Sequence, residues 1–380
     1  MQNFKRLLAA VCALVTLVLC CAGCSTPANA MTIDGYEVST GEYLANLYNM
    51  FYQAYYNSGL YYTAYYNNYT AEQIWDMDQT YGEGDTALTM KLDDYVKQMA
   101  KDSLIRQQVV KDLLKENELT LTDEDKKSLA EQMEQYNEAE FLQFGFNREN
   151  YEKMITGYNF EESALFYGLY DKGGKKEVKE DEVRKYFDTN YLVYKTFTLS
   201  LVDSEGAALK DAEATKIKDQ MKGYLDMYNN GTDVLEVYKK YLADEEAKQE
   251  ADKNDTTTTD KEEEEEIKLN FTSMVATGES ANKDLAKALQ GLKNGEATTV
   301  EYTASGSNKV IAFVVRYDYD TDTYKSKDEY YKDSRKSVLY NIKGDEFEES
   351  LKEPIKKMGE KVEVNERTIK MCDPINLLAE

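Results

Sequence analysis

Residues 191–202 alternate clearly between apolar and polar side chains. The apolar positions fall on one side of an extended backbone, and hydroxyl side chains fill the positions between them: Phe197, Leu199 and Leu201 are the apolar members. A period of two is typical of a strand with one buried face. Because the pattern before this stretch is mostly helical, we expect the strand to open a small α+β module set between helical segments.

Helical periodicity and capping signals cover much of the remaining chain. Helices are predicted at about 39–54, 86–117, 122–139, 148–170, 180–188, 209–228, 234–241, 284–292 and from 326 onward, with a kink near Pro354. Capping-box spacing, in which an acidic residue follows a hydroxyl residue three positions later, marks Ser39, Thr122 and Ser326. Two turn-linked extended pieces at 32–38, a buried strand at 310–316 and a last extended piece at 362–371 complete the prediction.

The N-terminal residues 1–24 have the pattern of a targeting segment. A basic pair precedes an apolar run at 7–22, which is short for a membrane span, and small residues then lead to Cys24. This order resembles the lipobox of bacterial lipoproteins, although Cys21 replaces the usual Leu. The resemblance implies acylation of Cys24, which would anchor the chain at the extracytoplasmic face of the bacterial cell membrane. An ordinary signal peptide cleaved near Ala28 or Ala30 is the alternative.

Composition narrows the partners and the chemistry. The formal net charge is −25 and the chain contains no histidine. Such an acidic chain should repel nucleic acid and anionic lipid, whereas basic or unfolded polypeptide and metal ions remain plausible partners. Cys372 is the only cysteine after residue 24, so no internal disulfide can form. Without His to activate it, we expect Cys372 to be an inert, packed thiol, and we predict no catalytic residue.

Tyrosine is dense between residues 55 and 69. A tyrosine ring has an apolar face and a polar tip, which suits a surface that must contact unfolded chain without aggregating. The alternative is that the rings pack on the protein body with wet hydroxyls, as aromatic stripes usually do. The client-binding hypothesis names the following residues: Tyr55, Tyr56, Tyr61, Tyr62, Tyr65 and Tyr66.

Two acidic segments in the C-terminal half of the chain differ in their expected structure. Residues 244–267 are rich in acids, Lys and Thr and cannot bury an apolar face, so we expect a disordered surface insertion. Carboxylates further on have the spacing of positions 1, 3, 5 and 12 of an EF-hand loop: Asp318, Asp320, Asp322 and Glu329. Calcium is therefore the one cofactor considered. Because the loop lacks the glycine that its sharp turn needs, an acidic hinge before the capping box is the alternative.

Four segments in this order resemble the PrsA/SurA group of extracytoplasmic foldases: residues 33–39, 182–187, 231–241 and 289–296. The resemblance implies a mostly helical α+β fold, in which a chaperone-like domain carries an inserted parvulin-like small antiparallel sheet flanked by helices. It divides the chain into a helical domain at 25–184, a degenerate parvulin-like domain at 185–323, and a C-terminal helix and strand at 324–380 that pack back on the first domain.

The chain departs from the parvulin pattern where the chemistry should lie. Parvulin-type prolyl isomerases carry a histidine on the first strand of this domain, and the register places Phe197 or Thr198 there. The second histidine, expected near 307–310, is also absent. Phe197 and Thr198 would then line a degenerate isomerase pocket with little or no activity.

Three functions follow from these patterns. The first is a lipid-anchored chaperone that assists the folding of secreted polypeptides without strong isomerase chemistry. The second is an active peptidyl-prolyl cis-trans isomerase with a histidine-free pocket. The third is a surface lipoprotein that binds one dedicated partner.

Overall fold

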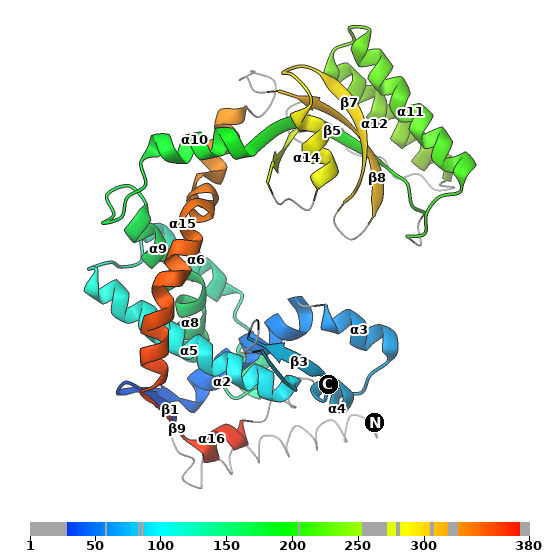
Figure 1. Cartoon of the computed structure of the whole chain (residues 1–380). Helices are drawn as coiled ribbons and strands as arrows, with labels where there is room; N and C mark the ends of the chain where they lie inside the picture. The colour runs from blue at the N-terminus through cyan, green and yellow to red at the C-terminus, as the bar shows by residue number, and fades with distance from the viewer. Residues whose placement is uncertain are drawn as a thin grey trace. The chain divides into compact units, whose positions relative to one another are not determined.

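The chain is a mixed α+β protein that divides into two compact units (Figure 1). The first unit combines residues 1–177 with 344–380, and the second spans 178–343. The computed structural model describes residues 29–57, 59–82, 84, 87–203, 206–252, 272–278, 282–304, 308–317 and 326–372. The predicted N-terminal targeting segment at 1–24, including Cys24, lies outside these residues.

The first unit is mainly helical. Its helices are α2 (Thr40–Tyr52), η1 (Gln53–Asn57), α3 (Leu60–Asn67), α4 (Ala71–Trp75), α5 (Leu92–Glu116), α6 (Asp123–Glu134), α7 (Glu138–Gln143), α8 (Arg148–Ile155), η3 (Thr156–Glu161), α9 (Glu162–Tyr170) and α16 (Glu366–Met371). Its strands are β1 (Asn29–Ile33), β2 (Tyr36–Ser39), β3 (Asp78–Tyr81), β4 (Leu88–Lys91) and β9 (Val362–Val364).

A small sheet joins the two ends of the described chain. Strand β1 lies between β2 and β9 and is antiparallel to both. The β1–β2 turn has positive φ at Asp34 (47°) and Gly35 (87°), as the predicted Asp-Gly hairpin requires. Strand β9 stops at Val364, and Asn365 caps α16 by accepting a hydrogen bond from the Thr368 amide at 3.3 Å. The predicted extended piece at 362–371 is therefore half strand and half helix.

The core between α2 and α5 contains a buried polar contact. The Gln107 amide nitrogen donates to Asn46 Oδ1 at 2.8 Å and to Ser103 Oγ at 3.0 Å. Gly157 of η3 packs against the same side chain, because a Cβ there would lie 2.5 Å from Gln107 Oε1. The single helix predicted at 148–170 is instead α8 and α9 joined by the π-helical turn η3, which places Gly157 at this contact.

A hairpin replaces the first turn of another predicted helix. Strands β3 and β4 pair antiparallel, and glycines at 82 and 84 with positive φ form part of their connection. Helix α5 begins at Leu92 and not near residue 86, because residues 88–91 pair with 78–81.

The second unit contains a four-stranded sheet. Its elements are α10 (Glu180–Asn190), β5 (Tyr191–Ser200), α11 (Asp211–Asn229), α12 (Val234–Asp252), β6 (Thr272–Ala276), α14 (Lys283–Gln290), β7 (Ala297–Thr303) and β8 (Lys309–Arg316). Helix α15 (Lys327–Gly359) begins in this unit, enters the first unit at Gly344 and continues past Pro354. Ser326 and Glu329 make both bonds of the predicted capping box at its start.

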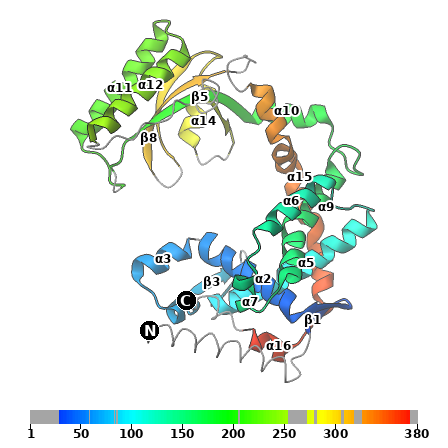
Figure 2. The same cartoon turned by 180° about the vertical axis from the view of Figure 1, so that it is seen from behind.

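The sheet order is β6-β5-β8-β7, and all neighbouring strands are antiparallel. Helices α11 and α12 cover one face and α14 covers the other, as both views show (Figure 2). Strand β8 is buried from Val310 to Val315, which confirms it as a central strand. A small antiparallel sheet flanked by helices is therefore present, and the parvulin-like character of this module remains a resemblance.

Part of the acidic segment is ordered, contrary to the prediction for 244–267. Helix α12 continues to Asp252. Its later turns are held by ion pairs along the helix, such as Lys248–Glu245 at 2.6 Å, and by the Tyr224 hydroxyl, which donates to Asp244 at 2.8 Å. Residues 253–267 lie outside the described part of the chain.

Candidate functional site

A group of exposed tyrosines occupies the end of α2, η1 and α3. We call these residues the tyrosine surface: Tyr52, Tyr56, Tyr61, Tyr62, Tyr65, Tyr66 and Tyr69. The most exposed are Tyr66 at 76%, Tyr65 at 65% and Tyr62 at 60%. A buried tyrosine ring would be expected to lose most of its accessible area, so these rings do not belong to the core.

The local backbone explains why the rings are exposed. Gly59 has a φ of 81° and separates η1 from α3, and Asn68 has a φ of 52° and ends α3. Between them, Ala64 is the only buried residue of α3. Besides Ala64, helix α3 contacts the unit through Tyr61, whose ring centroid lies 5.9 Å from that of Tyr55, and Figure 1 shows the helix at the margin of the first unit. The sequence alternative of rings packed on the body does not hold for the most exposed rings of this helix, Tyr62, Tyr65 and Tyr66.

Tyr55 differs from the other tyrosines named by the sequence. It is 6% exposed and stacks on Phe51 at 5.2 Å between ring centroids. Phe51 in turn contacts Trp75 at 5.0 Å. Tyr55 thus belongs to the aromatic core that supports the surface, whereas Tyr56, Tyr61, Tyr62, Tyr65 and Tyr66 lie on the surface.

Apart from Tyr69, the rings of the tyrosine surface form one continuous set of contacts. Centroid distances are 4.9 Å for Tyr52–Tyr56, 5.4 Å for Tyr56–Tyr61, 6.1 Å for Tyr61–Tyr65 and 5.6 Å for Tyr65–Tyr66. Aromatic pairs at such separations stabilise each other's orientation. Contiguous exposed aromatic area on a protein marks an interaction surface more often than scattered exposed residues do.

The two residues of the predicted isomerase pocket lie on opposite faces of β5, as consecutive strand residues must. Phe197 is 5% exposed and packs beneath α11 and α12, with its ring 4.9 Å from Phe313 and 4.5 Å from Tyr241. Thr198 is half-buried on the face that carries α14. Phe197 and Thr198 therefore do not line one pocket.

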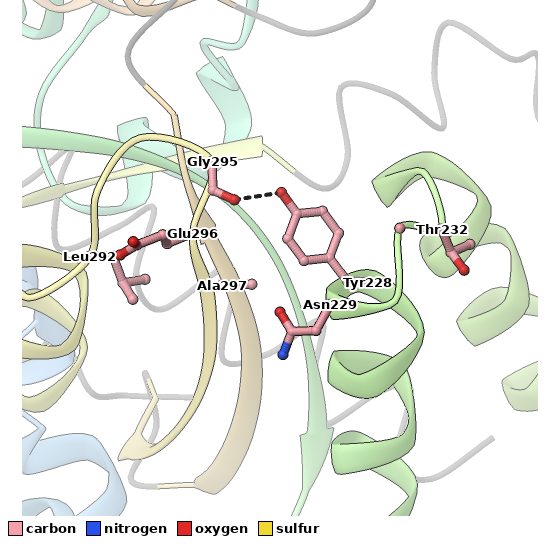
Figure 3. A pocket seen from close by; sticks show the side chains of 8 residues that line it. Tyr228, Asn229, Thr232, Leu292, Gly295, Glu296 and Ala297 are labelled. Atoms are coloured by element: carbon pink, nitrogen blue, oxygen red, sulfur yellow. Dashed lines mark hydrogen bonds between the residues drawn. The ribbon is translucent and has the colours of Figure 1, made fainter.

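An open pocket in the second unit lies where the end of α11 meets the turn before β7 (Figure 3). The Tyr228 hydroxyl donates to the Gly295 carbonyl oxygen at 2.7 Å across its wall. Glu296 is its one ionisable lining residue apart from Tyr228, and its carboxylate accepts a hydrogen bond from the Lys293 amide at 2.9 Å. These polar groups already hold the turn together, so the pocket offers little chemistry to a ligand.

Of the four carboxylates in the EF-hand hypothesis, the structure describes only the last, Glu329. The Glu329 carboxylate accepts a hydrogen bond from the Ser326 amide at 2.6 Å and thereby caps α15. Asp318, Asp320 and Asp322 lie outside the described residues. Within the described part of the chain, no cluster of acidic or cysteine side chains is arranged to hold a metal ion.

Lys195 is a buried ionisable group that the strand pattern did not single out. It is 3% exposed, and its ammonium lies 5.0 Å from the centre of the Tyr317 ring. Burial lowers the pKa of Lys195 to about 8 despite the nearby Asp233 carboxylate. The signal was present in the sequence, because Lys195 has the same strand parity as the inward-facing Phe197.

Cys372 is buried, and burial raises the pKa of its thiol to about 11. A thiol with a raised pKa carries little thiolate at neutral pH, which is the form that reacts. The environment of Cys372 therefore suits an inert packed residue and not a nucleophile.

Comparison with known proteins yields only distant structural likenesses. No protein-family model and no curated protein matches the chain. Two similar solved structures are foldase proteins PrsA. The one from Streptococcus pneumoniae str. Canada MDR_19A is 15% identical, with 79% of this chain and 99% of that chain covered and a TM-score of 0.37. The one from Lactococcus lactis is 16% identical, with 79% and 97% covered and a TM-score of 0.35. At these values the function must be argued from the chain's own residues.

Among the described residues, no helix combines the length and apolarity needed to cross a membrane.

Proposed function

We propose that this protein is a lipid-anchored extracytoplasmic chaperone that holds secreted polypeptides while they fold. Its first unit would bind the client through the tyrosine surface. Its second unit would serve as a binding or structural module with little or no prolyl isomerase activity.

The tyrosine surface carries this proposal. A chaperone must offer apolar area to many unfolded sequences and yet remain soluble by itself. Tyrosine meets both needs, because each ring presents an apolar face while its hydroxyl stays hydrated. Rings also lose little conformational entropy on binding, since each has only two side-chain torsions. A continuous set of exposed rings on one short helix supports a binding role better than a structural one.

The low isomerase activity follows from the side chains of the sheet. The chain contains no histidine. Phe197 is enclosed under two helices, and the opposite face of β5 carries the half-buried Thr198 and Thr196, the hydroxyl oxygen of Thr196 being buried. These groups offer no imidazole and no activated nucleophile. Catalysis of a rotation whose uncatalysed barrier is about 18–20 kcal/mol would then rest on shape alone.

The lipid anchor rests on the sequence around Cys24. An acylated N-terminal cysteine would hold the folded units near the membrane surface through which secreted chains emerge. Growth with a radiolabelled fatty acid tests this step. Label in the wild-type chain and none in Cys24→Ser supports the anchor, and equal labelling of both rejects it.

Suppression of aggregation tests the main proposal. The chain from residue 24 onward, with Cys24→Ser to prevent acylation, contains every described residue. Light scattering of several chemically unfolded clients should fall when this protein is present at about equimolar ratio. Substituting Ser at Tyr62, Tyr65 and Tyr66 together should raise the amount of protein needed about fivefold or more. Tyr158→Ser is the matched control, because Tyr158 is 43% exposed but belongs to η3.

Two outcomes would reject the proposal. One is a lack of any effect of the wild-type protein on all clients. The other is undiminished suppression by the triple Ser variant. A prolyl-peptide assay addresses the isomerase alternative separately: we expect the rate in buffer, and a clear acceleration would make the second unit an enzyme.

A further inference from the structure

The tyrosine surface belongs to a long stretch without cationic side chains. The sequence has neither Lys nor Arg between Arg6 and Lys91. Among the described residues, several aromatic rings have a Lys or Arg over their face. All of these rings lie outside the tyrosine surface, as does Tyr36, which has Lys111 at 5.6 Å. The faces of the exposed tyrosines are therefore not occupied by cations of the described chain.

The nearest cation along the sequence is already paired. The Lys91 ammonium lies 2.9 Å from an Asp78 carboxylate oxygen and 3.4 Å from one of Asp76, and it donates to the Asp76 carbonyl oxygen at 2.7 Å. Helix α4, which follows α3, adds the exposed Glu72. The segment that carries and follows the tyrosine surface therefore has an excess of negative charge.

Ring faces and carboxylates attract the same kind of ligand group. The π-system of tyrosine presents a negative face, and a guanidinium or ammonium placed over it within about 6 Å is attracted. At exposed sites each such contact strengthens binding about two- to fivefold. Glu72, on the helix that follows the rings along the chain, adds a screened attraction for the same cations.

We infer that the tyrosine surface selects polypeptide segments in which Arg or Lys alternates with apolar residues. The apolar side chains cover the ring edges and the cations lie over the ring faces. This inference rests on the proposed function, because it names the client segments that the chaperone surface prefers.

A membrane surface is the competing occupant for exposed tyrosines, since aromatic rings also favour the lipid interface. The charge argues against it. Anionic headgroups would meet the exposed carboxylate of Glu72, and the sequence between residues 7 and 90 has no lysine or arginine to attract them.

Matched peptides test the inference. The chain from residue 24 onward, with Cys24→Ser, is titrated into fluorescently labelled, unstructured peptides of alternating Leu and Arg, with Gly and Ser spacers. The comparison peptide carries citrulline at every Arg position, which keeps the shape and hydrogen-bonding groups but removes the charge. With two Arg side chains engaged, we expect the Arg peptide to bind about tenfold more tightly, equivalent to about 1.4 kcal/mol.

A neutral substitution separates ring recognition from bulk attraction by the acidic protein. Tyr62→Leu, Tyr65→Leu and Tyr66→Leu together keep apolar area and leave the charge unchanged at neutral pH. This variant should lose most of the preference for Arg over citrulline, whereas the corresponding Phe variant should keep it. Tyr158→Leu, at an exposed ring outside the surface, is the matched control.

Equal affinity of the wild-type protein for the two peptides would overturn the inference, and so would a full Arg preference in the triple Leu variant. Sedimentation with vesicles of anionic phospholipid provides the third measurement. Binding that depends on the three tyrosines would assign the surface to a membrane and overturn the inference. These failures leave the proposed function standing if unfolded neutral clients are still protected from aggregation.

Discussion

Arg106 connects three helices of the first unit, and its removal should destabilise that unit. The guanidinium donates from Nε to Glu162 Oε2 at 2.6 Å and from Nη2 to Glu162 Oε1 at 2.8 Å. Nη2 also donates to the two oxygens of Glu348 at 2.8 and 3.0 Å. Arg106 lies on α5, Glu162 opens α9 and Glu348 lies on α15. The cluster therefore holds the C-terminal helix against the N-terminal ones.

The size of the effect follows from the exposure of the three side chains. They are 30%, 30% and 40% exposed, so the pairs are neither fully buried nor fully screened. Hydrogen bonds to charged groups contribute about 1.5–3 kcal/mol when buried, and exposed ion pairs about 0–1 kcal/mol. We assign about 1 kcal/mol to each carboxylate pair, and about 0.5–1 kcal/mol to the repulsion between the two carboxylates left behind. Arg106→Leu should then lower the free energy of unfolding by about 2.5–3 kcal/mol.

The assay uses Trp75, the single tryptophan of the chain, which is buried in the first unit. Urea unfolding followed by its fluorescence reports the stability of that unit. Adding Glu348→Gln to Arg106→Leu should recover about 0.5–1 kcal/mol, because it removes the repulsion between carboxylates. Lys127→Leu is the control, since its pair with Glu131 at 3.7 Å is largely exposed and should contribute less than about 0.5 kcal/mol.

An Arg106→Leu variant that unfolds at the same urea concentration as the Lys127→Leu control would refute this reasoning. So would a double variant less stable than Arg106→Leu alone, because the remaining carboxylates would then not be repelling each other.

Three further predictions concern other parts of the chain. Gly157→Ala should destabilise the first unit by about 2–4 kcal/mol in the Trp75 assay, because the new Cβ would displace the Gln107 side chain from its buried hydrogen bonds. Lys195→Met should stabilise the second unit by about 1–2 kcal/mol at pH 7, measured by urea unfolding with tyrosine near-UV circular dichroism. The folded state favours neutral Lys195, so this gain should be complete below its folded pKa of about 8 and should vanish as pH rises toward about 10.4. Calcium titration calorimetry should show no heat above background, and a saturable signal lost in Asp318→Asn would instead establish an EF-hand-like loop at 318–329.

Local signals in the sequence predicted much of the fold. Ser39, Thr122 and Ser326 each accept a hydrogen bond from the amide three residues later, as their spacing indicated. The alternation at 191–202 predicted the strand that is β5, and the apolar run at 310–316 predicted the central strand β8. Helix caps depend on residues that are neighbours along the chain, and a central strand needs apolar residues on both faces. Both requirements are visible in the residue pattern.

Features set by distant contacts could not be read in the same way. Strand β7 was not predicted, because its mixture of Thr, Val and Tyr shows no clear alternation. In the structure it forms a strand by pairing with β8. The exposure of the tyrosine surface was also undecided. Periodicity cannot tell which side of α3 will find a packing partner. In the structure Ala64 is buried and Tyr61 lies against Tyr55, whereas Tyr62, Tyr65 and Tyr66 stay exposed. Tyr55 was grouped with the exposed rings for the same reason, although its stacking on Phe51 places it in the core.

Site-specific photo-crosslinking tests the central claim most directly. A benzophenone amino acid replaces Tyr65 in the full chain, and a secreted client is released in unfolded form beside it. We predict crosslinks from position 65 to the unfolded client that disappear once the client has folded, with few from the equally labelled control position of Tyr158. Crosslinking at the control position as strong as at position 65, or none from position 65 to any unfolded client, would contradict the account.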